Sequence, residues 1–363
     1  MDERIRKLNE QGQSLWLDYL DRKILDNGQL ASWIDHGITG VTTNPTIFQK
    51  AISSSELYDE SIRTWLDSHP AGSPETLLEQ LMVEDVTAAA DLLCPVHDRT
   101  EGQDGFVSLE VSPLLARDTE ATRQAVQRLH AAVARPNVMI KIPGTVEGLP
   151  AIRDMLTLGI PVNITLLFSV DRYRQVLDIW HSIAADRPRS ASVASVASFF
   201  VSRIDTRVDA LLEEHGSPEA LALRGRAAVA NARLAWSVLD GHPGSARRQN
   251  EVGGGPVQRL LWGSTGTKNP DYSDLLYVDE LVGPNTVNTV PPATLEAFLD
   301  HGDPSDRLSG HVEEARGLLE KLQSLGIDLN AVTARLEDEG VAAFTDSWNE
   351  LLQALEGRRR LLA

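Results

Sequence analysis

The sequence predicts an α/β fold, specifically a (β/α)₈ TIM barrel with additional helices at the carboxyl-terminal end. Apolar, β-branched stretches alternate with helical patterns along nearly all of the 363 residues, which is the order typical of a parallel sheet. Eight such stretches are present, and eight is the strand number of this barrel. The alternative is a doubly wound open sheet. It is disfavoured because the first strand is followed by Asp18-Tyr19-Leu20-Asp21, without the glycine-rich nucleotide-binding turn of that fold.

Each predicted strand is a short apolar run that ends at a turn residue or a proline. The predicted strands cover residues 15–19, 38–45, 106–111, 138–145, 161–168, 195–201, 259–264 and 286–290. In the fourth, Pro143-Gly144 ends the strand itself.

Helical patterns separate these strands. They cover residues 22–35, much of 46–98, 120–134, 148–158, 171–185, 205–239 and 293–301. Ser73 before Pro74 is the predicted N-cap of one helix. Residues 304–360 form two or three amphipathic helices, one starting near Asp328, and residues 253–256 form a glycine-rich loop. We expect one domain, residues 1–363, with a barrel core of about 14–302 and an extension of about 303–363.

Composition and charge exclude several classes of function. Thirty-four basic and 52 acidic side chains give a net charge of −18, which repels nucleic acid and anionic membranes. The single cysteine, Cys94, excludes an intrachain disulfide and fits a reducing cytoplasm. The amino terminus has no apolar signal segment, and no stretch reaches transmembrane length. The nine histidines show no metal-ligand spacing. We therefore expect a cytoplasmic protein without a disulfide or a thiolate metal site.

Lys141 is the first candidate for a catalytic residue. It lies among apolar residues in the predicted strand that Pro143 ends. In α/β folds the carboxyl ends of parallel strands are where active sites form. A partly desolvated lysine amine there can act as a nucleophile that forms a Schiff base. The competing interpretation is a lysine whose stem packs at a strand end while its charge reaches water.

Strand periodicity tests this interpretation, because alternate side chains of a strand point to opposite faces. One face of each barrel strand packs on helices and is apolar, and the other points inward. The inward face turns polar near the carboxyl ends of several strands. The polar residues are Asp18, Asn44, Glu110, Lys141, Asn163, Thr165 and Ser198. Burying so many polar groups is costly, so this set indicates a catalytic site more strongly than a hydrogen-bonded filling of the barrel mouth.

The same residues lie in motifs that resemble the transaldolase family, in its longer bacterial form. The matching stretches are 42–45 (TTNP), 107–111 (VSLEV), 140–143 (IKIP), 163–169 (NITLLFS), 200–203 (FVSR) and 263–270 (GSTGTKNP). They occur in the family's order between residues 15 and 292, and residues 339–348 resemble its terminal helix.

The resemblance implies a transferase of the pentose phosphate pathway with a class I aldolase mechanism, and it implies no metal or organic cofactor. It would move a dihydroxyacetone unit from sedoheptulose 7-phosphate or fructose 6-phosphate to glyceraldehyde 3-phosphate or erythrose 4-phosphate. By resemblance, Lys141 forms the Schiff base, Asp18 is the general base, and Glu110 and Thr165 hold a proton-shuttling water. Further residues implied to bind the three-carbon unit are Asn44, Asn163 and Ser198.

The resemblance also implies a phosphate site inside this acidic protein. Arg203 matches the family's phosphate arginine, which can bind phosphate in a bidentate manner. Ser264, Thr265 and Lys268 lie in a second phosphate segment, and the sequence does not distinguish Ser264 from Thr265 as the contact. Lys268 stands where shorter family members carry arginine, so its assignment is weaker.

Two alternatives remain at this level. One is a lyase resembling fructose-6-phosphate aldolase, whose members are shorter, carry tyrosine at the position of Phe200 and lack the glutamate matched by Glu110. The other is a sugar-phosphate-binding barrel without catalytic activity, which would tolerate loss of Lys141, Asp18 or Glu110. The sequence leaves the oligomeric state open, a homo-oligomer included.

Overall fold

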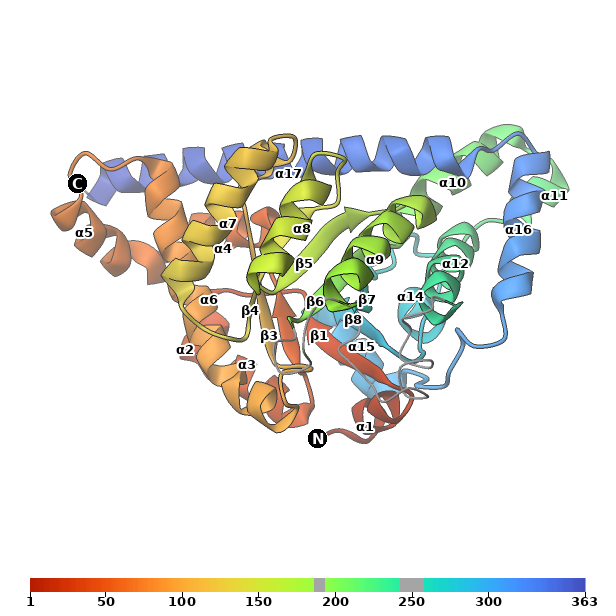
Figure 1. The fold of residues 1–363 in the computed structure, drawn as a ribbon, viewed down its shortest axis with the longest axis horizontal. Coiled ribbons are helices and arrows are strands. Elements are labelled where there is room, and N and C mark those ends of the chain that lie inside the picture. The colour runs from red at the N-terminus through yellow and green to blue at the C-terminus, as the bar shows by residue number, and fades with distance from the viewer. Residues whose placement is uncertain (186–192, 242–257, 363) are drawn as a thin grey trace.

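The computed structural model describes residues 1–185, 193–241 and 258–362. Its centre is a closed barrel of eight parallel strands in sequential order (Figure 1). The strands are β1 (Gln13–Leu17), β2 (Gly40–Thr42), β3 (Phe106–Glu110), β4 (Val138–Pro143), β5 (Val162–Leu167), β6 (Ser195–Phe200), β7 (Arg259–Gly263) and β8 (Thr286–Val290). β1 pairs with β8 over five residues. This pairing closes the barrel, confirms the predicted fold and rules out the open sheet.

Helices surround the barrel and fill the connections between its strands. Those up to β5 are α1 (Glu3–Glu10), α2 (Arg22–Asp26), α3 (Gln29–His36), α4 (Pro45–Ser54), α5 (Asp59–Ser68), α6 (Pro74–Arg99), α7 (Thr119–Val133) and α8 (Gly148–Leu158). Those after β5 are α9 (Val170–Ala185), α10 (Ser202–His215), α11 (Pro218–Leu221), α12 (Ala227–Gly241), α14 (Leu276–Asp279), α15 (Pro292–His301), α16 (Val312–Ser324) and α17 (Leu329–Leu362). Within the described ranges, none of these helices is long and apolar enough to span a bilayer.

Most predicted elements match the structure within a few residues, and the differences have local causes. The predicted helix 22–35 is two helices, because Gly28 adopts φ +76° and starts a second one. The Ser73 cap is confirmed, since its hydroxyl accepts a hydrogen bond from the Thr76 amide at 3.3 Å. Helix α1 was not predicted, although Asp2 caps it and its apolar face is buried. The predicted loop 253–256 lies outside the described residues.

The barrel interior confirms the predicted alternation of strand faces. An inner apolar cluster, separate from the main core, consists of Trp16, Phe106, Met139, Val196, Leu261 and Val287. The first four of these each lie two or four residues before a predicted inward polar residue. Their outward neighbours, such as Leu17 and Ile140, belong to the core between strands and helices. The inward face is therefore apolar near the amino ends of the strands and polar near the carboxyl ends.

A hydrogen-bond network around Asp104 closes the amino-terminal end of the barrel. Its carboxylate accepts hydrogen bonds from Trp16 Nε1 at 2.7 Å, Thr39 Oγ1 at 2.9 Å and Arg259 Nη1 at 3.3 Å, and from the hydroxyl of Ser14. Asp104 is 6% exposed. The network joins strands β1 and β7 to the segment before β3, at the end of the barrel opposite Lys141.

Replacing Asp104 by alanine is expected to destabilise the fold by about 3 kcal/mol, because the buried donors lose their acceptor and Arg259 loses its ion-pair partner. Urea denaturation measures this loss. The exposed Asp35→Ala variant, with an expected change within about 0.5 kcal/mol, is the control. Equal stability of the two variants would contradict a structural role for the network. Activity per folded molecule is expected to persist in both.

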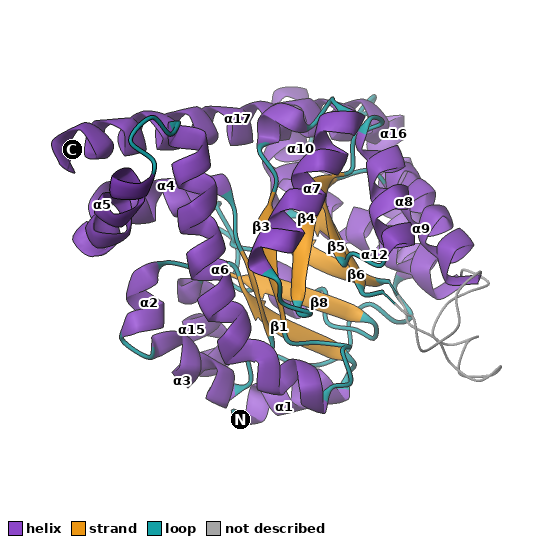
Figure 2. Ribbon diagram, turned by 60° about the vertical axis from the view of Figure 1, so that its left-hand side comes forward, coloured by secondary structure: helices purple, strands orange, loops and turns teal. Residues whose placement is uncertain are grey.

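Helix α17 crosses the carboxyl-terminal end of the barrel (Figures 1 and 2). It runs from the corner after α16 to a position beside α5, and packs against α4, α5 and α10 on the way. Thr46 and Ser347 share a hydrogen bond of 2.9 Å, and Arg358 binds Asp59 through two contacts of 2.6 and 2.8 Å. The sequence predicted tail helices, but not that one of them covers the barrel mouth.

Candidate active site

Lys141 lies inside the barrel mouth, next to Glu110. The two residues are directly paired in the register of β3 and β4, so their side chains point to the same face. Lys141 Nζ is 2.7 Å from Glu110 Oε1 and donates a hydrogen bond to the Thr43 carbonyl oxygen at 2.8 Å. Lys141 is 5% exposed and Glu110 is 6% exposed. The amine is thus held by a buried carboxylate that can accept its proton.

Asp18 completes a charged triad with Lys141 and Glu110. It follows β1, and its amide donates to the Val290 carbonyl at 2.8 Å, which extends the β1–β8 pairing by one residue. The hydroxyl of Thr42 donates to Asp18 Oδ1 at 2.8 Å and also contacts Thr289 Oγ1 at 2.7 Å. Backbone and side chain of Asp18 are therefore both fixed by neighbouring strands.

Burial dominates the electrostatics of both carboxyl groups. It raises the pKa of Asp18 above its usual value, against the opposing charge of Lys141 and hydrogen bonds from Thr42 and Asn44. Burial also raises the pKa of Glu110, Lys141 opposes this effect, and the negative charge of Asp18 adds to it. Carboxyl groups with raised pKa values bind protons more tightly than exposed ones, which suits them to exchange protons with a neighbouring amine.

Two asparagines are oriented by hydrogen bonds of different kinds. Asn44 is the N-cap of α4, and its Oδ1 accepts the Ile47 amide at 3.0 Å. This contact leaves the Asn44 NH₂ group to face Asp18. Asn163 donates from Nδ2 to Ser108 Oγ at 2.9 Å, and its Oδ1 accepts from Ser198 Oγ at 2.6 Å. The structure therefore brings the predicted residues Asn163 and Ser198 next to each other, joined by a hydrogen bond between their side chains.

Thr165 lies beside Lys141 at the strained end of β5. The register of β5 shifts between Ile164 and Leu167, and Leu166 adopts φ +60°, which is unfavourable for a branched side chain. The Thr165 hydroxyl is buried and makes no hydrogen bond with the described residues. It is available to a water or a substrate that binds next to Lys141.

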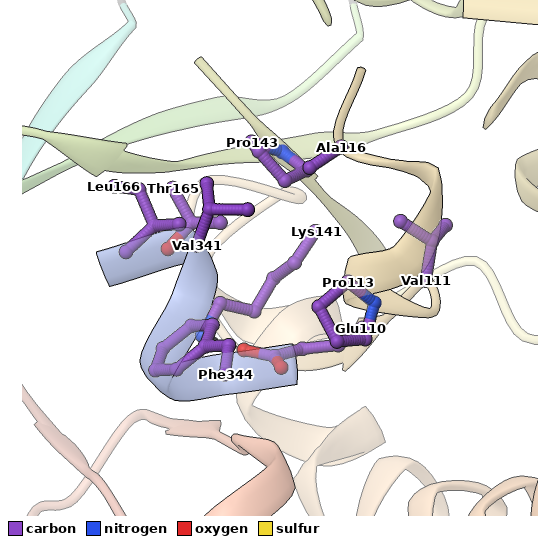
Figure 3. A pocket seen from close by; sticks show the side chains of 10 residues that line it. All are labelled: Glu110, Val111, Pro113, Ala116, Lys141, Pro143, Thr165, Leu166, Val341 and Phe344. Atoms are coloured by element: carbon purple, nitrogen blue, oxygen red, sulfur yellow. Dashed lines mark ion pairs between the residues drawn. The ribbon is translucent and has the colours of Figure 1, made fainter. Parts of the chain in front are cut away.

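Three of the predicted site residues, Glu110, Lys141 and Thr165, line a pocket, whereas Asp18, Asn44, Asn163 and Ser198 are not among its lining residues. Its lining residues are Glu110, Val111, Pro113, Ala116, Lys141, Pro143, Thr165, Leu166, Val341 and Phe344. Figure 3 shows Val341 and Phe344 of α17 facing the pocket from the side opposite the barrel strands. The pocket thus combines a reactive amine, a carboxylate and a hydroxyl with apolar walls.

Two cationic side chains form a second part of the candidate site: Arg203 at the start of α10 and Lys268 after β7. Arg203 is half-buried and forms no ion pair or hydrogen bond within the described ranges. Burial lowers its pKa, which the charge of Glu339 opposes. Partial desolvation, and repulsion from Arg203, lower the pKa of Lys268. Arg203 and Lys268 are thus two neighbouring cations without an ion pair of their own in the described part of the chain, a combination that attracts anions.

The two hydroxyl candidates of this region differ in their environment. Ser264 adopts φ +55° after β7 and contacts Ser202 Oγ at 3.0 Å, at the first turn of α10. Thr265 is fully buried and donates its hydroxyl to the Thr289 carbonyl at 3.0 Å. The Ser264 hydroxyl thus faces the start of α10, whereas the Thr265 hydroxyl is bound to the backbone of β8.

Comparison with known proteins identifies the family of the chain. The model of a family described as transaldolase/fructose-6-phosphate aldolase matches residues 15–355. The chain belongs to this family. "Transaldolase 1" of Streptomyces avermitilis is 47% identical, covering 97% of this chain and 95% of that protein. A "Transaldolase" of Saccharopolyspora erythraea is 48% identical, covering 97% and 96%. The matched regions include both the barrel and helix α17.

The structure also adds residues to the site that the sequence interpretation did not assign to it. Val341 and Phe344 lie on α17, about 200 residues from Lys141 in the chain, and no strand period relates them to the barrel. The carbonyl of Thr43 is a backbone contact that side-chain patterns do not reveal. The described residues contain no group of three His, Cys, Asp or Glu side chains that could hold a metal ion.

Proposed function

We propose that the protein acts as a transaldolase, transferring a dihydroxyacetone unit between sugar phosphates through a Schiff base on Lys141. The donors are sedoheptulose 7-phosphate or fructose 6-phosphate, and the acceptors are glyceraldehyde 3-phosphate or erythrose 4-phosphate. The observation that carries this proposal is the buried contact of 2.7 Å between Lys141 Nζ and Glu110 Oε1, with Asp18 in electrostatic reach of both. No metal or organic cofactor takes part in the proposed chemistry.

The first step is formation of the Schiff base. Glu110 takes a proton from the Lys141 ammonium, and the neutral amine attacks the ketone carbon of the donor. The resulting carbinolamine loses its hydroxyl as water, for which protonated Glu110 supplies the proton through a water held by Thr165. The raised pKa of Glu110 suits a group that must both accept and return a proton near neutral pH.

The second step is cleavage of the carbon–carbon bond. Asp18 removes the proton of the C4 hydroxyl, the C3–C4 bond breaks, and its electron pair passes into the iminium to form an enamine. The aldose leaves, while the three-carbon unit stays bound to Lys141. Asn44, Asn163 and Ser198 hold the hydroxyls of that unit until the acceptor aldehyde arrives. Transfer then repeats these steps in reverse.

Arg203 and Lys268 provide the phosphate site, and Ser264 provides its hydroxyl. The unpaired, half-buried Arg203 supports this assignment, as does its location at the amino-terminal end of α10, where helix amides favour anions. Thr265 has a structural role in this proposal, because its hydroxyl is bound to the β8 backbone.

Replacing Arg203 by alanine is expected to raise KM for phosphorylated acceptors about 10- to 100-fold, as loss of a charged hydrogen-bond donor does. The kcat value is expected to change little at saturation. Arg207→Ala, one turn further along α10, is the matched control. An equal increase of KM for unphosphorylated glyceraldehyde would show that Arg203 supports the site in general rather than binding phosphate.

The lyase reaction of the family is the alternative function. Lyases of this family are expected to carry tyrosine where this chain has Phe200, and the ring of Phe200 packs against Phe168 and Phe344 at centroid distances of 5.4 and 6.5 Å. This position thus offers no hydroxyl. In a coupled assay with fructose 6-phosphate alone, release of free dihydroxyacetone at the rate of transfer would favour the lyase.

Borohydride trapping tests the proposed Schiff base directly. The protein is incubated with fructose 6-phosphate without acceptor, reduced and digested, and the modified peptide is identified by mass spectrometry. A reduced three-carbon adduct on Lys141 is the expected result. An adduct on another lysine would overturn the site assignment, and no adduct on a folded protein that binds the sugar would favour a binding protein without activity.

A further inference from the structure

The guanidinium of Arg203 lies beside two aromatic rings that contact each other and come from distant parts of the chain. Its Cζ is 5.7 Å from the centroid of Phe200, at the end of β6, and 6.0 Å from that of Phe344, on α17. Both distances are within the range of cation–π attraction. Phe200 belongs to the barrel, whereas Phe344 reaches this position only because α17 crosses the barrel mouth.

These rings take the place that a carboxylate often has beside a half-buried arginine. Glu339 is the carboxylate whose charge reaches Arg203, and it pairs with Arg335 at 2.7 Å instead. Within the described ranges, Arg203 makes no ion pair and no hydrogen bond. Its orientation therefore depends on the two ring faces and on the surrounding packing.

An aromatic partner differs from a carboxylate in its effect on anion binding. A carboxylate would neutralise Arg203 and occupy its N–H donors, so a phosphate would have to displace it. A ring face attracts the cation without using these donors. Two rings can thus hold a half-buried arginine ready for a phosphate while all of its N–H donors stay free.

The packing of α17 fixes the position of Phe344. A Cβ at Gly340 would lie 3.0 Å from Leu166 Cδ2 and 3.7 Å from Arg203 Nη1, so this turn of α17 lies directly against both residues. Phe344 is 8% exposed and also lines the pocket over Lys141. Phe344 thus contacts Arg203 and also forms part of the wall of the pocket over Lys141, which Figure 3 shows.

We propose that Phe344 is a positioning residue for phosphate recognition: together with the adjoining ring of Phe200, its ring holds Arg203 in the orientation that receives the substrate phosphate. This inference rests on the proposed function, because it takes Arg203 as the phosphate ligand. It assigns the carboxyl-terminal helix a direct part in substrate affinity, beyond covering the barrel.

The test compares variants of Phe344 with a matched variant of α17. Phe344→Leu removes the aromatic face and keeps an apolar side chain, whereas Phe344→Tyr keeps the face. Trp348→Leu makes the same kind of change at a buried aromatic one turn further along the helix. The measurements are KM and kcat with erythrose 4-phosphate and with unphosphorylated glyceraldehyde as acceptors.

We expect Phe344→Leu to raise KM for erythrose 4-phosphate about 5- to 30-fold, the change that loss of a desolvated cation–π contact produces. KM for glyceraldehyde is expected to rise less than KM for erythrose 4-phosphate, because glyceraldehyde carries no phosphate and is affected only by the changed pocket wall. Phe344→Tyr is expected to restore the affinity for the phosphorylated acceptor. Unchanged KM in Phe344→Leu, or an equal increase in Trp348→Leu, would overturn the proposal.

Trapping with dihydroxyacetone separates this inference from the proposed function. Dihydroxyacetone carries no phosphate, so its reduced adduct on Lys141 is expected in the wild-type protein and in Phe344→Leu alike. Absence of the adduct in the wild type would reject the Schiff-base function. An adduct in the wild type but not in Phe344→Leu would show that Phe344 serves the amine pocket rather than Arg203.

Discussion

Replacing Lys141 by methionine is expected to lower kcat by about 10⁴-fold or more, because no other group in the pocket can form the covalent intermediate. Lys141 Nζ is the amine that contacts the buried Glu110 carboxylate. Methionine fills a similar apolar volume without the amine. Steady-state transfer assays measure the loss, and borohydride trapping is expected to yield no adduct. Lys321→Met, on the exposed surface of α16, is the control for loss of one lysine.

The variant must be shown to fold, because removing Lys141 leaves Glu110 buried without its ion-pair partner. Such a loss costs about 3–5 kcal/mol when the remaining group stays charged. The double variant Lys141→Met, Glu110→Gln removes both charges and is expected to regain most of the free energy of unfolding. It is expected to stay inactive. Normal turnover in either folded variant would disprove the proposed mechanism.

Strand periodicity accounts for what the sequence could predict. The alternation of side chains is local, so the residues themselves assign Lys141, Glu110 and Asp18 to one face of their strands. Barrel closure then brings these faces together, and the register of Glu110 with Lys141 confirms that step. The centre of the site was predictable from this period of two, and the fold class from the alternation of eight strand patterns with helical patterns.

The remaining parts of the site depend on where helices lie, which no local period determines. Phe344 and Val341 reach the pocket because α17 crosses the mouth, and that path results from contacts such as Arg358 with Asp59 at the far end of the helix. The choice between Ser264 and Thr265 depended on a tertiary contact with β8. The amphipathic pattern of the tail predicted helices, but not their partners.

Asp18→Asn is expected to separate formation of the Schiff base from cleavage of the sugar. The amide cannot accept the C4 proton, so transfer should fall about 10²–10⁴-fold, the usual contribution of a general base. Lys141 and Glu110 remain, so borohydride should still trap an adduct, now with the whole six-carbon sugar rather than the three-carbon unit. A three-carbon adduct formed at the wild-type rate would exclude Asp18 as the base. Asp26→Asn, at the exposed end of α2, is the control.

The pH dependence gives an independent test of the same assignment. Burial raises the pKa of Asp18, so the base becomes protonated at a higher pH than an exposed aspartate. The acid limb of the kcat/KM profile therefore shifts to higher pH.

The stability of the fold is expected to change with pH in the direction opposite to the activity. A carboxyl group with a raised pKa binds its proton more tightly in the folded than in the unfolded state, so its contribution to stability increases as pH falls through the folded pKa. At neutral pH the charged Asp18 therefore costs stability. The amide of the Asp18→Asn variant carries no charge, so this variant is expected to unfold at a urea concentration no lower than the wild type while losing its activity. This combination is the signature of a residue that is retained for chemistry rather than for folding.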